Sequence, residues 1–164
     1  MKGLRGFTKV WPLFAFVCNA LLFSATGCSK APDAPPLTVE VHADDTMRFD
    51  VTAFEARMGQ KVIVTFKNVG TTPKLTMGHN FVVLDHTVNT NSVQRFLDAA
   101  SLEAAHDYVP PGADEVLAHS KLLGPAETDV VTFNAPFAAG EYLFLCSFPG
   151  HYSQGSKGIM TVRP

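Results

Sequence analysis

The sequence has few cysteines, no block of basic residues and no long apolar run, and each lack excludes a class of protein. Three cysteines are too few for a fold held together by disulfides. Without a basic block, the chain is a poor candidate for binding nucleic acid through phosphate contacts. No apolar run reaches the roughly 18 residues that a membrane-spanning helix needs. The 164 residues include 46 % apolar and 17 % charged side chains, which suits one domain with a buried core.

The first 27 residues predict an export signal. A basic start with Lys2, Arg5 and Lys9 precedes an apolar stretch, which ends in small residues. This order is typical of a secretory signal peptide, which is removed from the mature protein. A buried N-terminal helix is the alternative, but Pro12 and the abrupt change to polar sequence fit it badly.

The small residues directly before Cys28 resemble the lipobox of bacterial lipoproteins, although Ala25 stands where that motif usually has leucine. The resemblance implies cleavage before Cys28, acylation of its thiol and stable attachment to a membrane surface. An ordinary signal peptide cut nearby would instead leave Cys28 as a free thiol. Removal of residues 1–27 takes away three of the 13 basic residues and none of the 15 acidic ones, so the net charge becomes −5.

The mature chain begins with a predicted tether, residues 28–37, which is rich in proline and lacks an apolar period. A single domain is predicted from residue 38 to residue 164. Within it, apolar and polar residues alternate in seven or eight short segments separated by Gly, Pro, Asn and Asp. This pattern favours an all-β sandwich or barrel. The residues expected to share one face of a strand are Val39 with Val41, Met47 with Phe49 and Val51, Val62 with Val64 and Phe66, Val131 with Phe133, and Tyr142 with Phe144 and Cys146.

One segment departs from the alternating pattern. The spacing predicts a helix from Asn91 to His106, and Asn91 with Gln94 resembles a capping box at its start. A single helix inserted between strands is expected to pack on the side or end of the sandwich. The apolar residues at helical spacing are Val93, Phe96, Leu97, Ala100 and Ala104.

The last third of the chain contains a thiol and an imidazole on one tight turn. Cys146 ends a predicted strand, and His151 follows beyond a turn that contains Pro149 and Gly150. His79, in a loop far away in sequence, is the third candidate. A thiolate with two imidazoles is the ligand set of a blue-copper site, which is acceptable to both Cu(I) and Cu(II). Because the strong positions around the metal are then filled, such a site favours electron transfer over catalysis.

Both candidate loops resemble those of the azurins. Residues 77–82 (MGHNFV) are similar to the first azurin ligand loop, and residues 146–151 (CSFPGH) are similar to the second. Residues 107–109 (DYV) and 116–124 (VLAHSKLLG) also look azurin-like. The resemblance covers most of residues 45–164 and implies a Greek-key β-sandwich of the cupredoxin type, here with one inserted helix, that carries electrons.

The resemblance also implies which residues bind the metal. His79, Cys146 and His151 would hold one copper ion in their plane, with the Gly78 carbonyl as a weak axial ligand. As a carrier and not an enzyme, the protein would exchange electrons with redox proteins such as c-type cytochromes or a copper reductase.

Further groups are expected to orient these ligands. By the same resemblance, Asn80 would join the two ligand loops through hydrogen bonds near Ser147. The backbone N–H of Phe148 would donate toward the Cys146 sulfur. Such outer contacts tune the potential of a metal site.

Two features depart from the azurin pattern. Azurins generally have a disulfide near the N-terminus, and this sequence has no cysteine pair to form one. Azurins also place an axial methionine after the second histidine, where this chain has Gly155 and Ser156. The following Lys157–Gly158 pair aligns with the family's Lys-Gly, which favours Ser156 as the equivalent position. We therefore predict three strong ligands with the Gly78 carbonyl, water or the Ser156 hydroxyl at the axis.

Several other uses of these residues are alternatives. A cysteine hydrolase would use Cys146 as a nucleophile and would leave one histidine unexplained. A multicopper enzyme needs a histidine beside the cysteine, where this chain has Leu145 and Ser147, and a binuclear copper centre needs a second nearby cysteine. A periplasmic protein that holds or delivers copper would use the same three ligands. Zinc also accepts Cys and His, but the order of affinities favours Cu(II).

We expect an exported electron carrier, in the periplasm or on the outer surface of the cell envelope, anchored by a lipid at Cys28. Partners are expected to dock briefly at an apolar rim that includes Met77, Phe148 and Pro149. The remaining histidines are expected to be ordinary surface or hydrogen-bonded residues: His42, His86, His106 and His119.

Overall fold

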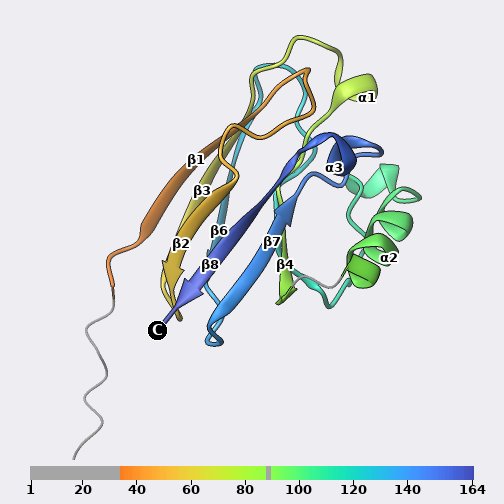
Figure 1. Ribbon diagram of the computed structural model, residues 1–164. Coiled ribbons are helices and arrows are strands. Elements are labelled where there is room, and N and C mark those ends of the chain that lie inside the picture. The colour runs from red at the N-terminus through yellow and green to blue at the C-terminus, as the bar shows by residue number, and fades with distance from the viewer. Residues whose placement is uncertain (1–33, 88–89) are drawn as a thin grey trace, which may run out of the picture. The chain divides into compact units, whose positions relative to one another are not determined.

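The computed structural model describes residues 34–87 and 90–164, and β-strands dominate them (Figure 1). The predicted signal peptide, Cys28 and most of the predicted tether lie outside the described residues. So does the side chain of His86. The first strand begins at Leu37, one residue before the predicted start of the domain. None of the helices in the described part of the chain is long and apolar enough to cross a membrane.

Two sheets face each other, as the sequence predicts for a β-sandwich. The smaller sheet has the order β1-β3-β6, and the larger has the order β2-β8-β7-β4-β5. Two pairs, β1 with β3 and β2 with β8, are parallel, and the other pairs are antiparallel. The smaller sheet consists of β1 (Leu37–Ala43), β3 (Lys61–Asn68) and β6 (Thr128–Asn134). The larger consists of β2 (Ala53–Arg57), β4 (Val82–Thr87), β5 (Val116–His119), β7 (Gly140–Leu145) and β8 (Lys157–Arg163).

Alternation of side chains explains how the sheets pack. In β3, Val62, Val64 and Phe66 are fully buried, while the residues between them face outward. Successive side chains of a strand point to opposite faces, so a period of two places one set in the core. In the larger sheet, the side chains of β7 are buried on both faces of the sheet, because a helix covers the outer face of the sheet at this strand.

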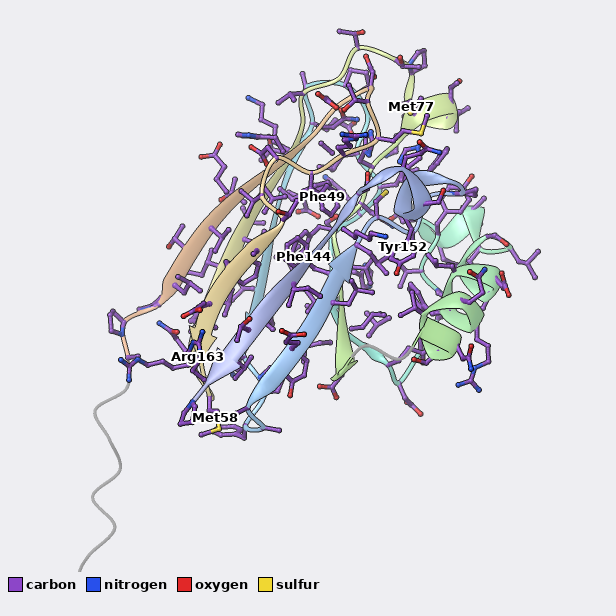
Figure 2. All side chains as sticks on the ribbon, viewed as in Figure 1. Phe49, Met58, Met77, Phe144, Tyr152 and Arg163 are labelled. Atoms are coloured by element: carbon purple, nitrogen blue, oxygen red, sulfur yellow. The ribbon has the colours of Figure 1, made fainter. Side chains whose placement is uncertain are left out.

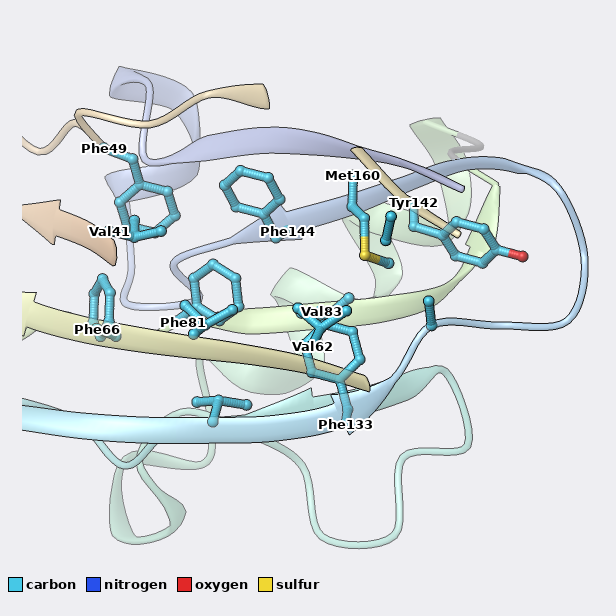
Figure 3. Close-up of a cluster of buried hydrophobic side chains, with 14 of the residues drawn as sticks. Val41, Phe49, Val62, Phe66, Phe81, Val83, Phe133, Tyr142, Phe144 and Met160 are labelled. Carbon is cyan, nitrogen blue, oxygen red and sulfur yellow. The ribbon is translucent and has the colours of Figure 1, made fainter. Parts of the chain in front are cut away.

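Aromatic rings fill the space between the two sheets (Figure 3). The ring of Phe81 lies 5.9 Å from that of Phe66 and 5.2 Å from that of Phe144, measured between centroids. Phe49 joins the same group, 5.6 Å from Phe66. Gly158 makes this packing possible, since a Cβ there would collide with the Phe144 ring. These rings and their aliphatic neighbours form the main hydrophobic core.

The predicted strand over Met47, Phe49 and Val51 is wrong. Met47 adopts a left-handed conformation with φ of 58°, and the Asp44 carboxylate accepts a hydrogen bond from the Thr46 N–H. A turn therefore replaces the strand, and Phe49 keeps only an isolated bridge to Ala43. The ring of Phe49 is nevertheless 4 % exposed, so the pattern identified a core residue but not its backbone conformation.

The inserted helix is shorter than predicted. Helix α2 spans Thr90–Ala100, and a separate 3-10 turn spans Ala104–His106. The Ser101 hydroxyl donates to the Asp98 carbonyl oxygen where the helix ends. Asn91, predicted as the cap, lies inside the helix. The apolar face of α2 packs on the outer side of the larger sheet, beside β4 and β7 (Figure 1), through Val93, Phe96 and Ala100 against Val82, Leu84, Leu143 and Leu145.

The strands run between two ends that differ in their loops. The single-turn helices α1 (Lys74–Met77) and α3 (His151–Gln154) lie at the end where β4 begins and β7 finishes. We call residues 74–81 and 146–156 the site end. Residues 57–61, 135–140 and Arg163 form the opposite end. Figure 2 shows Met77 and Tyr152 at the site end, far from Met58 and Arg163.

Candidate metal centre

His79 is held in place by backbone pairing just before β4. Its N–H donates to the Leu123 carbonyl oxygen at 3.0 Å, and its carbonyl accepts from the Leu123 N–H at 2.7 Å. Glycine precedes it because space is short: a Cβ at Gly78 would lie 2.6 Å from the Lys74 carbonyl oxygen and 2.8 Å from Leu122 Cγ. The imidazole of His79 is fully buried as a result.

Cys146 and His151 lie on one tight connection between β7 and β8. The Cys146 N–H donates to the Ser156 carbonyl oxygen at 2.9 Å, which closes the base of the connection. Gly150 has φ of 87°, a left-handed conformation that glycine adopts without strain, and it reverses the chain before His151. The predicted reversal at this turn is confirmed.

The donor atoms of the three residues meet at one point. The Nδ1 atoms of His79 and His151 are 3.1 Å apart, and the Cys146 Sγ lies 3.5 Å from the His151 Nδ1. All three donor atoms lie within 4.8 Å of one another. The structure therefore brings together the residues that the sequence analysis selected. They form the only such group of three or more His, Cys, Asp or Glu residues found in the described ranges.

The spacing of these atoms fits a small metal ion. Three ligands placed about 2.0–2.3 Å from one ion in a trigonal plane lie about 3.5–3.8 Å apart. The observed separations of 3.1 and 3.5 Å are within about half an ångström of that spacing. One thiolate and two imidazoles are also the soft and intermediate donors that copper prefers.

Burial sets the charge of these donors. Burial and, to a smaller extent, the neighbouring His79 ring together lower the pKa of His151 to about 4. Burial also lowers the pKa of His79, against the opposing effect of the Asp44 backbone and of the charges on Asp44 and Asp45. Both rings are therefore neutral at pH 7, as metal ligands must be.

The thiol of Cys146 is affected in the opposite direction. Burial raises its pKa to about 12, while the backbone N–H groups of Asn80 and Phe148 oppose that rise by hydrogen bonding to the sulfur. The predicted contribution of Phe148 is present, and that of Asn80 is additional. Without a metal the residue is a thiol, so binding of a metal as thiolate must release its proton.

A buried polar network joins three loops around the donors. The Asn80 Nδ2 donates to the Ser147 Oγ at 2.8 Å and to the Asp107 carbonyl oxygen at 2.7 Å. The Ser147 N–H donates back to the Asn80 Oδ1 at 2.8 Å, as predicted for these two residues. The Ser147 hydroxyl donates to the Tyr108 carbonyl oxygen at 2.6 Å. Two of these bonds join the two ligand loops to each other, and the other two fix each ligand loop to the loop at residues 107–108.

The third loop of this network was not assigned a role by sequence reasoning. Asp107 and Tyr108 both have left-handed backbones, with φ of 56° and 59°. Consecutive left-handed residues other than glycine are unusual, and here they aim two carbonyl oxygens at Asn80 and Ser147. The Tyr108 ring also meets Phe148 edge-on at 4.9 Å, and Phe148 lies 4.7 Å from the His151 ring. The azurin-like residues 107–109 pointed to this loop but not to the role of its backbone carbonyls.

Ser156 occupies a buried position next to the donors. It is 0 % exposed, its N–H donates to the His151 carbonyl oxygen, and its own carbonyl accepts from Cys146. Its hydroxyl oxygen is buried without a hydrogen-bond partner among the described residues. An unsatisfied buried hydroxyl is unfavourable, and the Ser156 Oγ is therefore free to interact with a further group. Gly155, the other candidate for the missing methionine, has φ of 119° and lies under Arg48.

The Nε2 atom of His79 is the second buried polar atom without a hydrogen-bond partner in the described part of the chain. When Nδ1 faces a metal, Nε2 carries the proton and needs an acceptor. The backbone of Asp44 is near this ring and raises its pKa, against the larger opposing effect of burial.

Three of the remaining histidines are engaged elsewhere, as expected. The ring of His42 lies between two carboxylates, 2.7 Å from Asp50 and 2.9 Å from Glu40. His106 pairs with Glu103 at 2.8 Å, and the His119 Nδ1 is 3.0 Å from its neighbour's carbonyl oxygen. None of them joins the donor cluster.

A two-sheet sandwich that buries one cysteine and two histidines at its loop end defines a metalloprotein of the cupredoxin class. The chain matches the family described as copper binding proteins, plastocyanin/azurin family, over residues 37–163. This match covers most of the chain, so the protein belongs to the plastocyanin/azurin family, and its cofactor is copper.

Individual relatives agree with this assignment. The chain is 40 % identical to an azurin of Bordetella pertussis over 121 residues, which is 72 % of this chain and 79 % of that one. It is 35 % identical to an azurin of Pseudomonas aeruginosa over 133 residues, covering 79 % and 87 % of the two chains. A dithionite-reduced auracyanin from Roseiflexus castenholzii has a similar structure, with a TM-score of 0.70 and 32 % identity over 80 % of this chain and 100 % of that one.

Proposed function

We propose that the protein is a blue-copper electron carrier, not an enzyme, and that His79, Cys146 and His151 are its ligands. The convergence of their donor atoms within 4.8 Å is the observation that carries the proposal. When bound there, copper supplies a one-electron couple between Cu(I) and Cu(II). All three residues are at most 2 % exposed, so the strong ligand positions are shielded and no substrate reaches them.

The rigid surroundings suit this role. The polar network of Asn80 and Ser147 holds both ligand loops at fixed separation, and the β-strands behind them do not share the flexibility of long loops. A site that changes little between oxidation states loses and gains an electron with little rearrangement. This argument supports transfer over delivery of copper, because delivery requires the ligands to open.

Electrons would pass through the apolar surface above His151. Phe148 and Met77 are partly exposed there and Pro149 is exposed, while Leu75 of α1 is 91 % exposed. A small apolar patch of this kind suits brief contact with a redox protein, of which a c-type cytochrome or a copper reductase is the expected kind.

Ser156 is proposed to complete the axial side of the metal. Its unpartnered hydroxyl would interact with the metal directly or through a water, while the Gly78 carbonyl would approach from its own loop as a weak ligand. A change in the visible spectrum of the copper protein on Ser156→Ala tests this role. An unchanged spectrum would rule out a bond from Ser156 and leave the Gly78 carbonyl or water as the axial candidate.

Export and anchoring complete the proposal. The basic, apolar and small-residue order of residues 1–27 supports export to the periplasm or the outer envelope surface, and the lipobox-like segment supports a lipid at Cys28. Mass spectrometry of the native N-terminus tests it, since the proposal requires an acylated Cys28.

Addition of Cu(II) to the purified metal-free protein is the test of the central proposal. We expect an intense blue colour, reversible reduction by a cytochrome without loss of metal, and loss of the colour in Cys146→Ser. His119→Gln is the matched control, because His119 lies outside the donor cluster, and it should stay blue. Transfer of copper to an acceptor protein, without fast electron exchange, would favour copper delivery instead.

A further inference from the structure

The end of the sandwich opposite the metal centre has an exposed apolar surface. Phe137, in the turn between β6 and β7, is 85 % exposed, and Met58, in the turn between β2 and β3, is 37 % exposed. The two turns touch: a Cβ at Gly59 would lie 2.6 Å from the Phe137 ring, and the Gly59 N–H donates to the Ala135 carbonyl oxygen. We call Met58 and residues 137–139 the apolar foot. Apolar side chains that are exposed together at one place are candidates for a contact surface.

The N-terminal segment enters the domain at the same end. The Gln60 side chain donates to the Pro35 carbonyl oxygen at 2.7 Å and accepts from the Arg57 N–H at 2.9 Å. Strand β1 then starts at Leu37, opposite Val62 near the start of β3. The chain is therefore fixed beside the β2–β3 turn that carries Met58 (Figure 2).

The predicted lipid site lies a short distance along the chain from this point. Cys28 precedes Ala34, the first described residue, by six positions. Six residues span at most about 20 Å even when fully extended. A lipid at Cys28 would thus keep Ala34, where the chain enters this end of the domain, within about 20 Å of the bilayer surface, and the chain could bring the foot into contact with it.

The charges at this end do not oppose contact with an anionic membrane. Residues 34–164 carry nine basic and 14 acidic residues, a net charge of −5. The opposite end, as defined above, has three basic side chains, Arg57, Lys61 and Arg163, and no acidic one, while Glu55 and Glu141 lie next to it. Arg163 and Glu55 form an ion pair across β8 and β2. The negative charge of the domain is therefore concentrated elsewhere on its surface.

We infer that the apolar foot rests on the lipid surface to which the protein is anchored. The inference depends on the lipid that the proposed function places on Cys28. Phe137 enters the headgroup region, and Met58 lies at its edge. Because strands β7 and β3, with six and eight residues, separate the two ends by about 20–25 Å, the metal centre faces away from the membrane, where soluble redox partners reach it.

Tryptophan fluorescence tests this orientation. The sequence has one tryptophan, Trp11, which is removed with the predicted signal peptide, so Phe137→Trp gives a single probe. The lipidated full-length variant is placed in vesicles of phosphatidylethanolamine and phosphatidylglycerol, with and without bromine on the acyl chains. We expect bromine to reduce its emission by about half or more, because interfacial side chains enter about 5–10 Å into the headgroup and acyl boundary. Met58→Trp should be quenched as well, though less.

Leu75→Trp at the site end and Leu102→Trp after α2 are matched controls, since both residues are more than 80 % exposed. For each control, the ratio of emission in brominated vesicles to emission in ordinary vesicles should stay near one. Because copper quenches the emission equally in both kinds of vesicle, this ratio does not depend on quenching by copper. Equal quenching at Phe137 and Leu75, or none at Phe137, would overturn the inference. So would a blue shift of the Phe137→Trp emission without vesicles that grows with protein concentration, which would identify a second copy as the occupant.

Flotation of the vesicles distinguishes failure of the foot from failure of the anchor. Protein that floats with the vesicles but shows no quenching at Phe137 retains the lipid anchor and lacks the orientation. Protein that does not float lacks the anchor, and the inference fails with it. In both cases the blue colour reports separately whether the proposed copper site is correct.

Discussion

The aromatic core and the polar network around the metal ligands are both buried, but they are held together in different ways. In the core, Phe66, Phe81 and Phe144 contact one another through ring faces and edges, and none of these side chains contributes a hydrogen bond. Around the metal centre, Asn80 and Ser147 make hydrogen bonds that are each directed at one atom. Hydrophobic contact is non-directional, whereas a hydrogen bond requires a particular donor and acceptor at a particular angle.

The difference indicates which region sets stability and which sets the geometry of the metal. Burial of apolar area supplies most of the free energy of folding, and many side chains of suitable volume can provide it. Only a few side chains can satisfy the directed bonds that position His79, Cys146 and His151. Substitutions in the two regions should therefore separate changes in stability from changes in the properties of the site.

The largest expected effect is the loss of the thiol. Because burial raises the pKa of Cys146 to about 12, copper binding near pH 7 should release about one proton per metal ion. Cys146→Ser should release none, and its affinity for copper should fall steeply. Titration of Cu(II) into unbuffered metal-free protein, followed by a pH electrode, measures both quantities. His119→Gln should behave like the wild type, and proton release that persists in Cys146→Ser would contradict the assignment.

The next largest effect is the removal of a core ring. Phe144→Ala should lower the free energy of unfolding by about 3–5 kcal/mol, because it removes a large buried side chain and leaves a cavity. Denaturation by urea measures this change. The visible spectrum of the folded copper protein should stay the same. A shift of the blue band in Phe144→Ala would mean that the core also sets the geometry of the site. It would contradict the separation of stability and site geometry between the two regions.

The same contrast explains what the sequence could predict. Strand β3 could be identified because Val62, Val64 and Phe66 alternate with polar residues, and that period follows directly from strand geometry. The segment at Met47 could not, because a left-handed residue and the Asp44 cap ended the alternation without removing Phe49 from the core. The regular spacing of apolar residues therefore predicts which residues are buried more reliably than it predicts their backbone conformation.

The metal ligands could be predicted because their chemistry belongs to the side chains of particular residue types. Cys146 and His151 flank a Pro-Gly turn, and His79 was found through the similarity of its loop to azurins. The contributions of Asp107 and Tyr108 could not be predicted, because they come from backbone carbonyls that every residue possesses. Only the left-handed conformation of these residues gives the carbonyls their function, and no pattern of residue types encoded it.

A smaller effect is expected in the polar network. Asn80→Ala and Ser147→Ala should each lower the free energy of unfolding by about 1–3 kcal/mol, since each leaves a buried partner unsatisfied. Their effects should not add in the double variant, because they share the bonds between Asn80 and Ser147. Unlike Phe144→Ala, both should also shift the potential measured by voltammetry. Additive losses without a change in potential would remove the distinction between the two regions.

The smallest effect concerns Asp45, which fastens the loop before α1 from the surface. Its carboxylate accepts hydrogen bonds from the Thr71 N–H and hydroxyl, both at 2.9 Å, and from the Thr72 N–H at 3.2 Å. The backbone bond from Thr71 is the main cause that lowers the pKa of Asp45 from 3.8 to about 2. A carboxyl with a lowered pKa in the folded state stabilises the protein above its unfolded pKa, and this contribution is lost as the pH falls toward the folded value. The stability advantage of wild type over Asp45→Asn should therefore be complete above about pH 5 and should shrink between about pH 4 and pH 2. Urea denaturation of the metal-free proteins at several pH values measures it, and Thr71→Val, which keeps the backbone donor, should show only part of the effect. An advantage that does not depend on pH in this window would assign the contribution of Asp45 to packing instead of charge.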